Sequence, residues 1–238
     1  MAKGILSRLM GGLGRFGDAP EPEPGAEPGA APQPQMAAGL VPEPGPQPDD
    51  DPVVEYEGDL RNALRRDLPS LALRSHDGAT TDLSALNSPA VLFTFPHLGV
   101  AGVPWPEGWD QVPDADGSAA LACSFRDAMD DFERFGIKDL FGVSSQTVPE
   151  LREAAHRLAL PFPVLSDPRL QLAFEIDLPR VFVAHQSYFA PTVLVVQRGV
   201  VVAGLQPGRE PATAAARLLT RLKEVTAEQR RAAQEAKE

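Results

Sequence analysis

The residues best suited to chemistry lie in one short stretch, from Asp116 to Asp127, which contains Cys123, the only cysteine of the chain. This stretch follows an apolar, strand-like run at 90–95 and opens a segment whose apolar residues have helical spacing. Because a helix N-terminus stabilises an anion, a thiol near this one is a candidate nucleophile. The apolar residues that define the spacing are Leu121, Ala122, Phe125, Met129 and Phe132.

The surroundings of Cys123 favour a different interpretation. At 100° per residue, Cys123 falls on the side of the predicted helix away from the apolar residues. Asp127 and Asp130 share that side and disfavour a thiolate, with only Arg126 opposing them. The pattern therefore favours an unreactive thiol over a residual redox or cross-linking thiol.

The remaining counts exclude several classes of site. A single cysteine excludes an internal disulfide, a CxxC pair and a cysteine-built zinc site. The four histidines show no metal-ligand spacing, so each is interpreted as an ordinary surface or loop residue, and we expect no metal and no cofactor.

The net charge of −11 is concentrated in one region. Residues 18–59 carry eleven acidic residues and no Lys or Arg, whereas residues 1–17 contribute +3 and the remainder −3. The rest of the chain offers no basic patch of the kind that nucleic acid requires, so no nucleic-acid partner is expected.

Residues 1–17 place six apolar side chains at roughly helical spacing, with Lys3, Arg8 and Arg15 elsewhere on the wheel. One interpretation is a weak anchor to an anionic membrane surface or to a partner groove. The other is a disordered start, because five glycines each disfavour helix by about 1 kcal/mol. Both remain open, and the expected location is the cytoplasm, with a peripheral position at the inner membrane surface under the first interpretation.

Residues 18–52 contain eleven of the 25 prolines, mixed mainly with acidic residues, Gly, Ala and Gln. Such a composition cannot bury enough apolar surface to fold. The segment is predicted to be a disordered, semi-extended linker that reaches up to about 100 Å.

The folded domain is predicted at 68–222, after a lead-in at 53–67 with a short helix at 60–66 and before a charged helical tail at 223–238. Strands and helices alternate along it: strands at 68–75, near 80, at 90–95, 137–145 and 160–167, and helices at 118–135, 148–160, 168–174 and 211–224. A hairpin of 188–197 and 200–205 surrounds Arg198-Gly199. This order predicts an α/β sandwich around a mixed sheet.

Three stretches resemble the peroxiredoxins, in the bacterioferritin-comigratory or PrxQ branch of the AhpC/TSA group. They read LPSLALRSHDGATTDLSAL, ACSFRDAMDDFERFGI and VSSQTVPELREAAHRLALPFPVLSD, and the resemblance covers roughly 68–222. It implies the peroxiredoxin version of the thioredoxin fold, a three-layer sandwich with a mixed β-sheet.

On the motif of these peroxiredoxins, Cys123 falls on the second, resolving cysteine and Ser118 on the first, peroxidatic one. The catalytic arginine aligns with Ala190. The active-site Thr and Pro align with Ala115 and Gln111. An 18-residue insert, residues 97–114, separates Ala115 from Pro96, which resembles the strand-end proline. Taken alone, Ser118 also suits a helix N-cap, and the sequence favours that structural role.

These departures have chemical consequences. A serine hydroxyl is far less acidic than a thiol and cannot be oxidised to a sulfenic acid. Without the arginine, nucleophile and transferred oxygen lose charge stabilisation. We therefore interpret the chain as a catalytically impaired binding or scaffolding module. The alternative is an active peroxide-reducing oxidoreductase that uses Cys123 alone and a thioredoxin-like reductant.

Two further pairs are candidate binding residues. Pro191-Thr192 resembles the cis-proline element of thioredoxins, which faces the active-site helix. Trp105 and Trp109, in the insert, suit either a partner-binding surface or the packing of the insert onto the domain, and packing is favoured.

Overall fold

The computed structural model describes residues 55–105, 108–112, 117–183 and 185–235. The segments 1–17 and 18–52, with the membrane and linker interpretations placed on them, lie outside these residues, as does Ala115.

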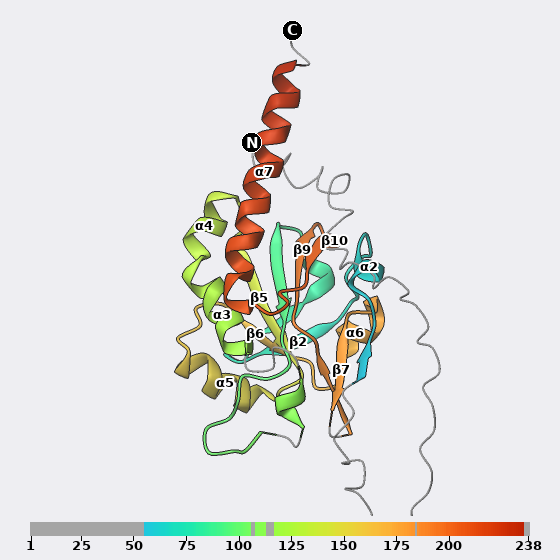
Figure 1. Ribbon diagram of the computed structural model, residues 1–238, viewed down its shortest axis with the longest axis vertical. Helices are drawn as coiled ribbons and strands as arrows, with labels where there is room; N and C mark the ends of the chain where they lie inside the picture. The colour runs from blue at the N-terminus through green and yellow to red at the C-terminus, as the bar shows by residue number, and fades with distance from the viewer. Residues whose placement is uncertain (1–54, 106–107, 113–116, 184, 236–238) are drawn as a thin grey trace, which may run out of the picture. The chain divides into compact units, whose positions relative to one another are not determined.

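A seven-stranded mixed sheet forms the centre of the described structure (Figure 1). Strands β4, β5 and β6 are parallel neighbours, and the strands on either side of them are antiparallel. The predicted mixed α/β sandwich is thereby confirmed. The order across the sheet is β10 (Val200–Leu205), β9 (Thr192–Gln197), β4 (Ala90–Thr94), β5 (Asp139–Ser144), β6 (Val164–Ser166), β2 (Ala72–Ser75) and β3 (Thr80–Asp82).

A second, three-stranded antiparallel sheet consists of β1 (Glu55–Glu57), β7 (Arg180–Val183) and β8 (Gln186–Phe189), in the order β1-β7-β8. The sequence predicted one strand over 188–197, and this prediction is wrong. The chain changes sheets at Ala190-Pro191, where proline has no N–H to continue a ladder. Strand β8 therefore pairs with β7, and β9 pairs with β4.

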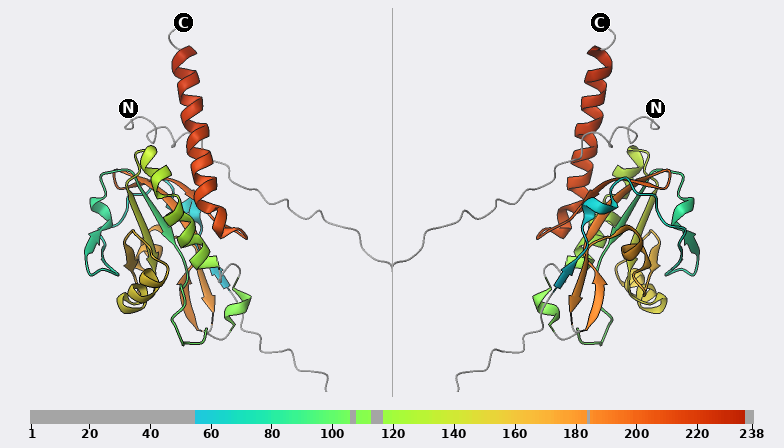
Figure 2. Two further views of the ribbon diagram at one scale, coloured as in Figure 1. Left: turned by 90° about the vertical axis from the view of Figure 1, so that its left-hand side faces the viewer. Right: turned by 90° about the vertical axis from the view of Figure 1, so that its right-hand side faces the viewer.

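The helices cover both faces of the large sheet. Helices α3, α4, α5 and α7 share one buried apolar cluster with one face, whereas α2 and α6 share a second cluster with the other. Figure 2 shows α3 and α7 side by side over the sheet. The helices are α2 (Leu60–Ala63), α3 (Ser118–Asp127), α4 (Met129–Arg134), α5 (Val148–Arg157), α6 (Gln171–Ile176) and α7 (Ala214–Glu235), with 3-10 turns η3 (Leu83–Ala85), η4 (Trp109–Gln111) and η6 (Pro211–Thr213).

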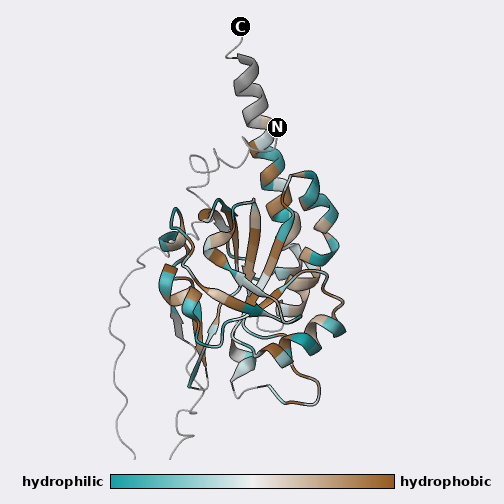
Figure 3. Cartoon of the chain, turned by 180° about the vertical axis from the view of Figure 1, so that it is seen from behind, coloured by the Kyte–Doolittle hydropathy of each residue, from teal (hydrophilic) through white to brown (hydrophobic). Residues whose placement is uncertain are grey.

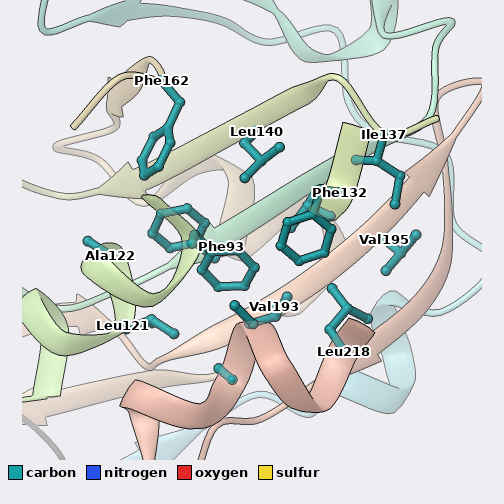
Figure 4. Close-up of a cluster of buried hydrophobic side chains, with 14 of the residues drawn as sticks. Phe93, Leu121, Ala122, Phe132, Ile137, Leu140, Phe162, Val193, Val195 and Leu218 are labelled. Carbon is teal, nitrogen blue, oxygen red and sulfur yellow. The ribbon is translucent and has the colours of Figure 1, made fainter. Parts of the chain in front are cut away.

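Strand β4 is buried on both faces because its side chains alternate between the two clusters. Val91 and Phe93 join the cluster under α3, whereas Ala90 and Leu92 join the opposite one. Figure 4 shows Phe93 among Leu121 and Ala122 of α3 and Phe132 of α4. The ring of Phe93 stacks on that of Phe125 with 4.6 Å between centroids. Figure 3 shows the same pattern in hydropathy, with apolar strands inside and polar stretches on the outer helices.

Two predicted helices have different bounds. The helix expected over 118–135 breaks at Ala128, whose N–H bonds to both Arg126 and Phe125 carbonyls and so tightens the turn. The helix expected from Pro168 begins instead at Gln171, because the buried Asp167 carboxylate accepts hydrogen bonds from the Gln171 and Leu172 N–H groups.

Candidate functional site

The first residue of α3 is Ser118, whose side chain is only 1 % exposed. The N-cap of the helix is Gly117, so the prediction that Ser118 caps the helix is wrong by one residue. Ser118 belongs to the first turn itself, where the helix dipole favours negative charge. An anion at this position would be stabilised by the helix, but the side chain of Ser118 is a neutral hydroxyl.

The start of α3 is enclosed by the segment that leads into α7. A Cβ atom on Gly117 would lie 2.2 Å from Cγ of Pro211, the first residue of η6, so only glycine fits without movement of the neighbour. The backbone of Gly117 is in the ordinary right-handed region, with φ of −77°. The glycine is therefore required for close packing rather than for its conformational freedom.

Cys123 lies further along the same helix and is partly exposed. Its neighbour Arg126 donates hydrogen bonds to the Asp127 carboxylate and to the Leu158 carbonyl. The pKa of Arg126 is raised, first by that bond to Asp127 and then by the charge of a Cys123 thiolate. The cation expected to stabilise the thiolate is thus shared with a carboxylate.

Ser118 and Cys123 are five residues apart on one unbroken helix. At 1.5 Å and 100° per residue, they are separated by about 7.5 Å along the axis and about 140° around it. Their side chains therefore point in different directions, and the two positions cannot form a covalent pair unless the first turns of α3 unwind.

Ala190 is 4 % exposed and lies between β8 and β9. Its N–H donates to the Pro179 carbonyl, and its carbonyl accepts from the Thr94 hydroxyl at 2.7 Å and from the Thr192 hydroxyl at 3.2 Å. Thr94 and Thr192 are paired directly across β4 and β9. A neutral hydroxyl network thus surrounds this position.

Thr94 was not singled out from the sequence. The signal was present, because a threonine ends the apolar run that becomes β4 and must find a partner when buried. The described residues contain one buried arginine, Arg180, which is committed elsewhere. Its guanidinium bonds to Glu57 and lies 4.3 Å from the centroid of the Phe174 ring.

The peptide bond between Ala190 and Pro191 is trans, as are all peptide bonds of the described residues. The resemblance to a cis-proline element is therefore not matched in geometry. Thr192 is fully buried and forms the first residue of β9.

The two tryptophans of the insert lie together. Their rings stack with 5.3 Å between centroids and 9° between planes. Trp109 is 3 % exposed and packs edge-on against Tyr188 of β8, whereas Trp105 remains 45 % exposed. Trp109 therefore attaches the insert to the small sheet at Tyr188, which precedes Ala190 by two residues.

His97, for which the sequence indicated an ordinary surface or loop position, belongs to this aromatic cluster. It is partly buried, and its ring meets those of Trp105 and Trp109 nearly edge-on. Among the described residues, no group of three or more His, Cys, Asp or Glu side chains could hold a metal ion. Within the same part of the chain, no helix is long and apolar enough to cross a membrane.

Solved structures resemble this one with TM-scores slightly above 0.5. The peroxidoxin BcpB of Mycobacterium tuberculosis is 20 % identical at a TM-score of 0.54, over 68 % of this chain and 97 % of that one. Peroxiredoxin Q of Xanthomonas campestris is 20 % identical at 0.52, over 68 % and 98 %. A serine mutant of PrxQ from Xylella fastidiosa is 18 % identical at 0.53, over 71 % and 95 %.

The chain has a peroxiredoxin-like fold. No protein-family model and no curated protein sequence matches it, so the likeness is carried by the structure. In this structure, the Thr94 hydroxyl joins the end of β4 to Ala190. The contact between Trp109 and Tyr188 joins the insert to the same region. Cys123 takes no part in these contacts and lies on the more exposed side of α3.

Proposed function

We propose that this chain is a peroxiredoxin-like protein without peroxidase activity, which acts as a binding or scaffolding module. The observation that carries the proposal is Ser118, an enclosed serine at the first position of α3. A serine hydroxyl has no useful anionic fraction near neutral pH unless a base removes its proton. It also cannot follow the oxidation of a thiolate to a sulfenic acid.

Ala190 supports the same proposal. The methyl side chain of Ala190 offers no charge to a developing oxyanion. The backbone carbonyl of Ala190 already accepts two hydroxyl hydrogen bonds. Hydrogen-bond donors or cations aimed at the reacting oxygen commonly contribute 10²- to 10³-fold in rate. The loss of both the nucleophile and the cation argues against residual peroxide chemistry at this position.

Partial exposure of Cys123 beside Arg126 favours one alternative, a thiol peroxidase that uses Cys123 alone. In that reaction the thiolate attacks the O–O bond, takes one oxygen as sulfenic acid and releases water or an alcohol. A dithiol such as reduced thioredoxin then returns the thiol, forms its own disulfide and releases water.

One assay separates the two functions. The full chain is given hydrogen peroxide or an organic hydroperoxide, with reduced thioredoxin or dithiothreitol as electron donor, and compared with Cys123→Ala. We expect the wild-type rate to equal that of Cys123→Ala and of donor alone. A turnover on the order of 1 s⁻¹ or more that Cys123→Ala abolishes would establish the peroxidase instead.

The N-terminal segment supplies a second element of the proposal. Residues 1–17 combine six apolar residues with three cations, and we propose that they attach the protein weakly to an anionic membrane surface from the cytoplasmic side. The acidic segment 18–52 would then act as the tether of the module.

A further inference from the structure

His97 occupies the junction between β4 and the aromatic cluster. It is the third residue after β4, and its ring centroid lies 5.5 Å from that of Trp105 and 6.0 Å from that of Trp109. Trp105 stacks on Trp109, and Trp109 packs on Tyr188. The imidazole thus contacts both members of the stack that attaches the insert to the small sheet.

A hydrogen bond that only the neutral imidazole can accept holds the turn after His97. The Gly99 N–H donates to Nδ1 of His97 at 2.8 Å. A protonated imidazole carries hydrogen on both nitrogens and has no acceptor there.

Gly99 itself supports Trp105. Its φ of +74° favours glycine, and a Cβ at this position would lie 3.3 Å from two atoms of the Trp105 ring. The turn that bonds to His97 is therefore also the turn against which Trp105 packs.

We propose that His97 is a pH switch for this aromatic cluster: the neutral imidazole holds the turn and Trp105 against Trp109, and protonation releases them and exposes the buried indole of Trp109. The switch is independent of the peroxidase question, because it involves neither Ser118 nor Cys123.

The charged groups that face this region lie mainly on α5. Glu150 favours a positive His97, whereas Arg157 donates to the Leu98 carbonyl and pairs with Glu153, so that its charge is compensated. From β8, Tyr188 packs behind Trp109, and burial raises the pKa of Tyr188, so it stays neutral in acid. Gln146 accepts from the Leu98 N–H and is uncharged.

Burial lowers the pKa of His97 below its ordinary value of 6.5, and the opposing effect of Glu150 is smaller. The closed cluster therefore binds protons less readily than the open one. Its stability is fully present above about pH 6.5, falls as the open form takes up a proton, and reaches its minimum below the pKa of the closed form.

Intrinsic fluorescence reports directly on this switch, because Trp105 and Trp109 are the only tryptophans in the chain. The full chain is titrated from neutral to acidic pH while emission, acrylamide quenching and far-UV circular dichroism are recorded. We expect a red shift and stronger quenching with a midpoint below 6.5, at unchanged secondary structure.

Two variants assign the transition to His97. In His97→Asn the side-chain oxygen can accept from Gly99 and does not titrate, so the fluorescence should stay that of the closed cluster across the range. His156→Asn, at an exposed histidine on α5, is the matched control and should keep the wild-type transition. A transition that survives in His97→Asn, or that is absent from the wild-type protein while it remains folded, overturns the proposal.

A measurement on the wild-type protein covers the case in which His97→Asn does not fold. The imidazole of His97 and the two indole N–H groups are followed by NMR during the same titration. A common midpoint supports the switch, whereas indole signals that do not follow the His97 titration refute it.

Discussion

The Thr94 hydroxyl donates a 2.7 Å hydrogen bond to the Ala190 carbonyl, across 96 residues of sequence. This buried contact joins the end of the central strand to the point at which the chain passes from the small sheet to the large one. Thr192 adds a second, longer hydrogen bond to the same carbonyl. A carbonyl held this way fixes the backbone at the position where the resemblance to peroxiredoxins implies an arginine.

Thr94→Val should test the strength of that contact. Valine has nearly the same shape but cannot donate, and the loss of a buried hydrogen bond of this kind costs about 1–2 kcal/mol of unfolding free energy. Urea unfolding measures the difference. Thr220→Val is the control, because Thr220 makes the same kind of bond, to Ala216, on the exposed surface of α7. Equal losses in the two variants would contradict the structural importance of the Thr94 contact.

Gly117→Ala should destabilise the start of α3. The new methyl group would meet Pro211 at 2.2 Å, and overpacking of this kind costs about 1–3 kcal/mol. Because Pro211→Ala removes the atom of closest approach, the double variant should lose less stability than the sum of the single losses. Strict additivity would show that η6 does not pack against this turn in solution.

Ser118→Cys should place a thiol at the first position of α3, where the helix dipole favours the thiolate by about 0.3–1 kcal/mol. This corresponds to less than one pKa unit, so we expect only modest reaction with peroxide. Once oxidised, the new thiol should form a disulfide with Cys123, after the intervening turns unwind.

Mass spectrometry of peroxide-treated Ser118→Cys detects that disulfide. In the Ser118→Cys, Cys123→Ala double variant the oxidised thiol has no intramolecular partner and should proceed to sulfinic acid. If Ser118→Cys stays reduced, or overoxidises to the same extent as the double variant, position 118 is not the nucleophile position.

Deletion of residues 1–17 should abolish binding to vesicles that contain anionic lipid. We expect the full chain to sediment with such vesicles at low salt and to be released at high salt, because the attraction of three cations to the surface is screened. Vesicles of neutral lipid serve as the control. Absence of sedimentation at low salt would exclude the membrane anchor.

The sequence alone determined the order of the elements and the class of fold. Apolar runs separated by turn residues located β4, β5, β6 and β10, because strands buried on both faces have little choice of side chain. Helical spacing located α3, α5 and α7 in the same way. The cysteine count and the serine at position 118 also limit the chemistry that the chain can perform.

Only the tertiary structure decided which of these residues meet. The Thr94–Ala190 bond, the packing of Pro211 on Gly117 and the joining of His97 to the tryptophan stack depend on contacts between distant segments, which local periodicity does not encode. The change of sheets at Ala190-Pro191 was missed for the same reason: β8 and β9 are both apolar, and their separation depends on pairing with β7 and β4 rather than on their own composition.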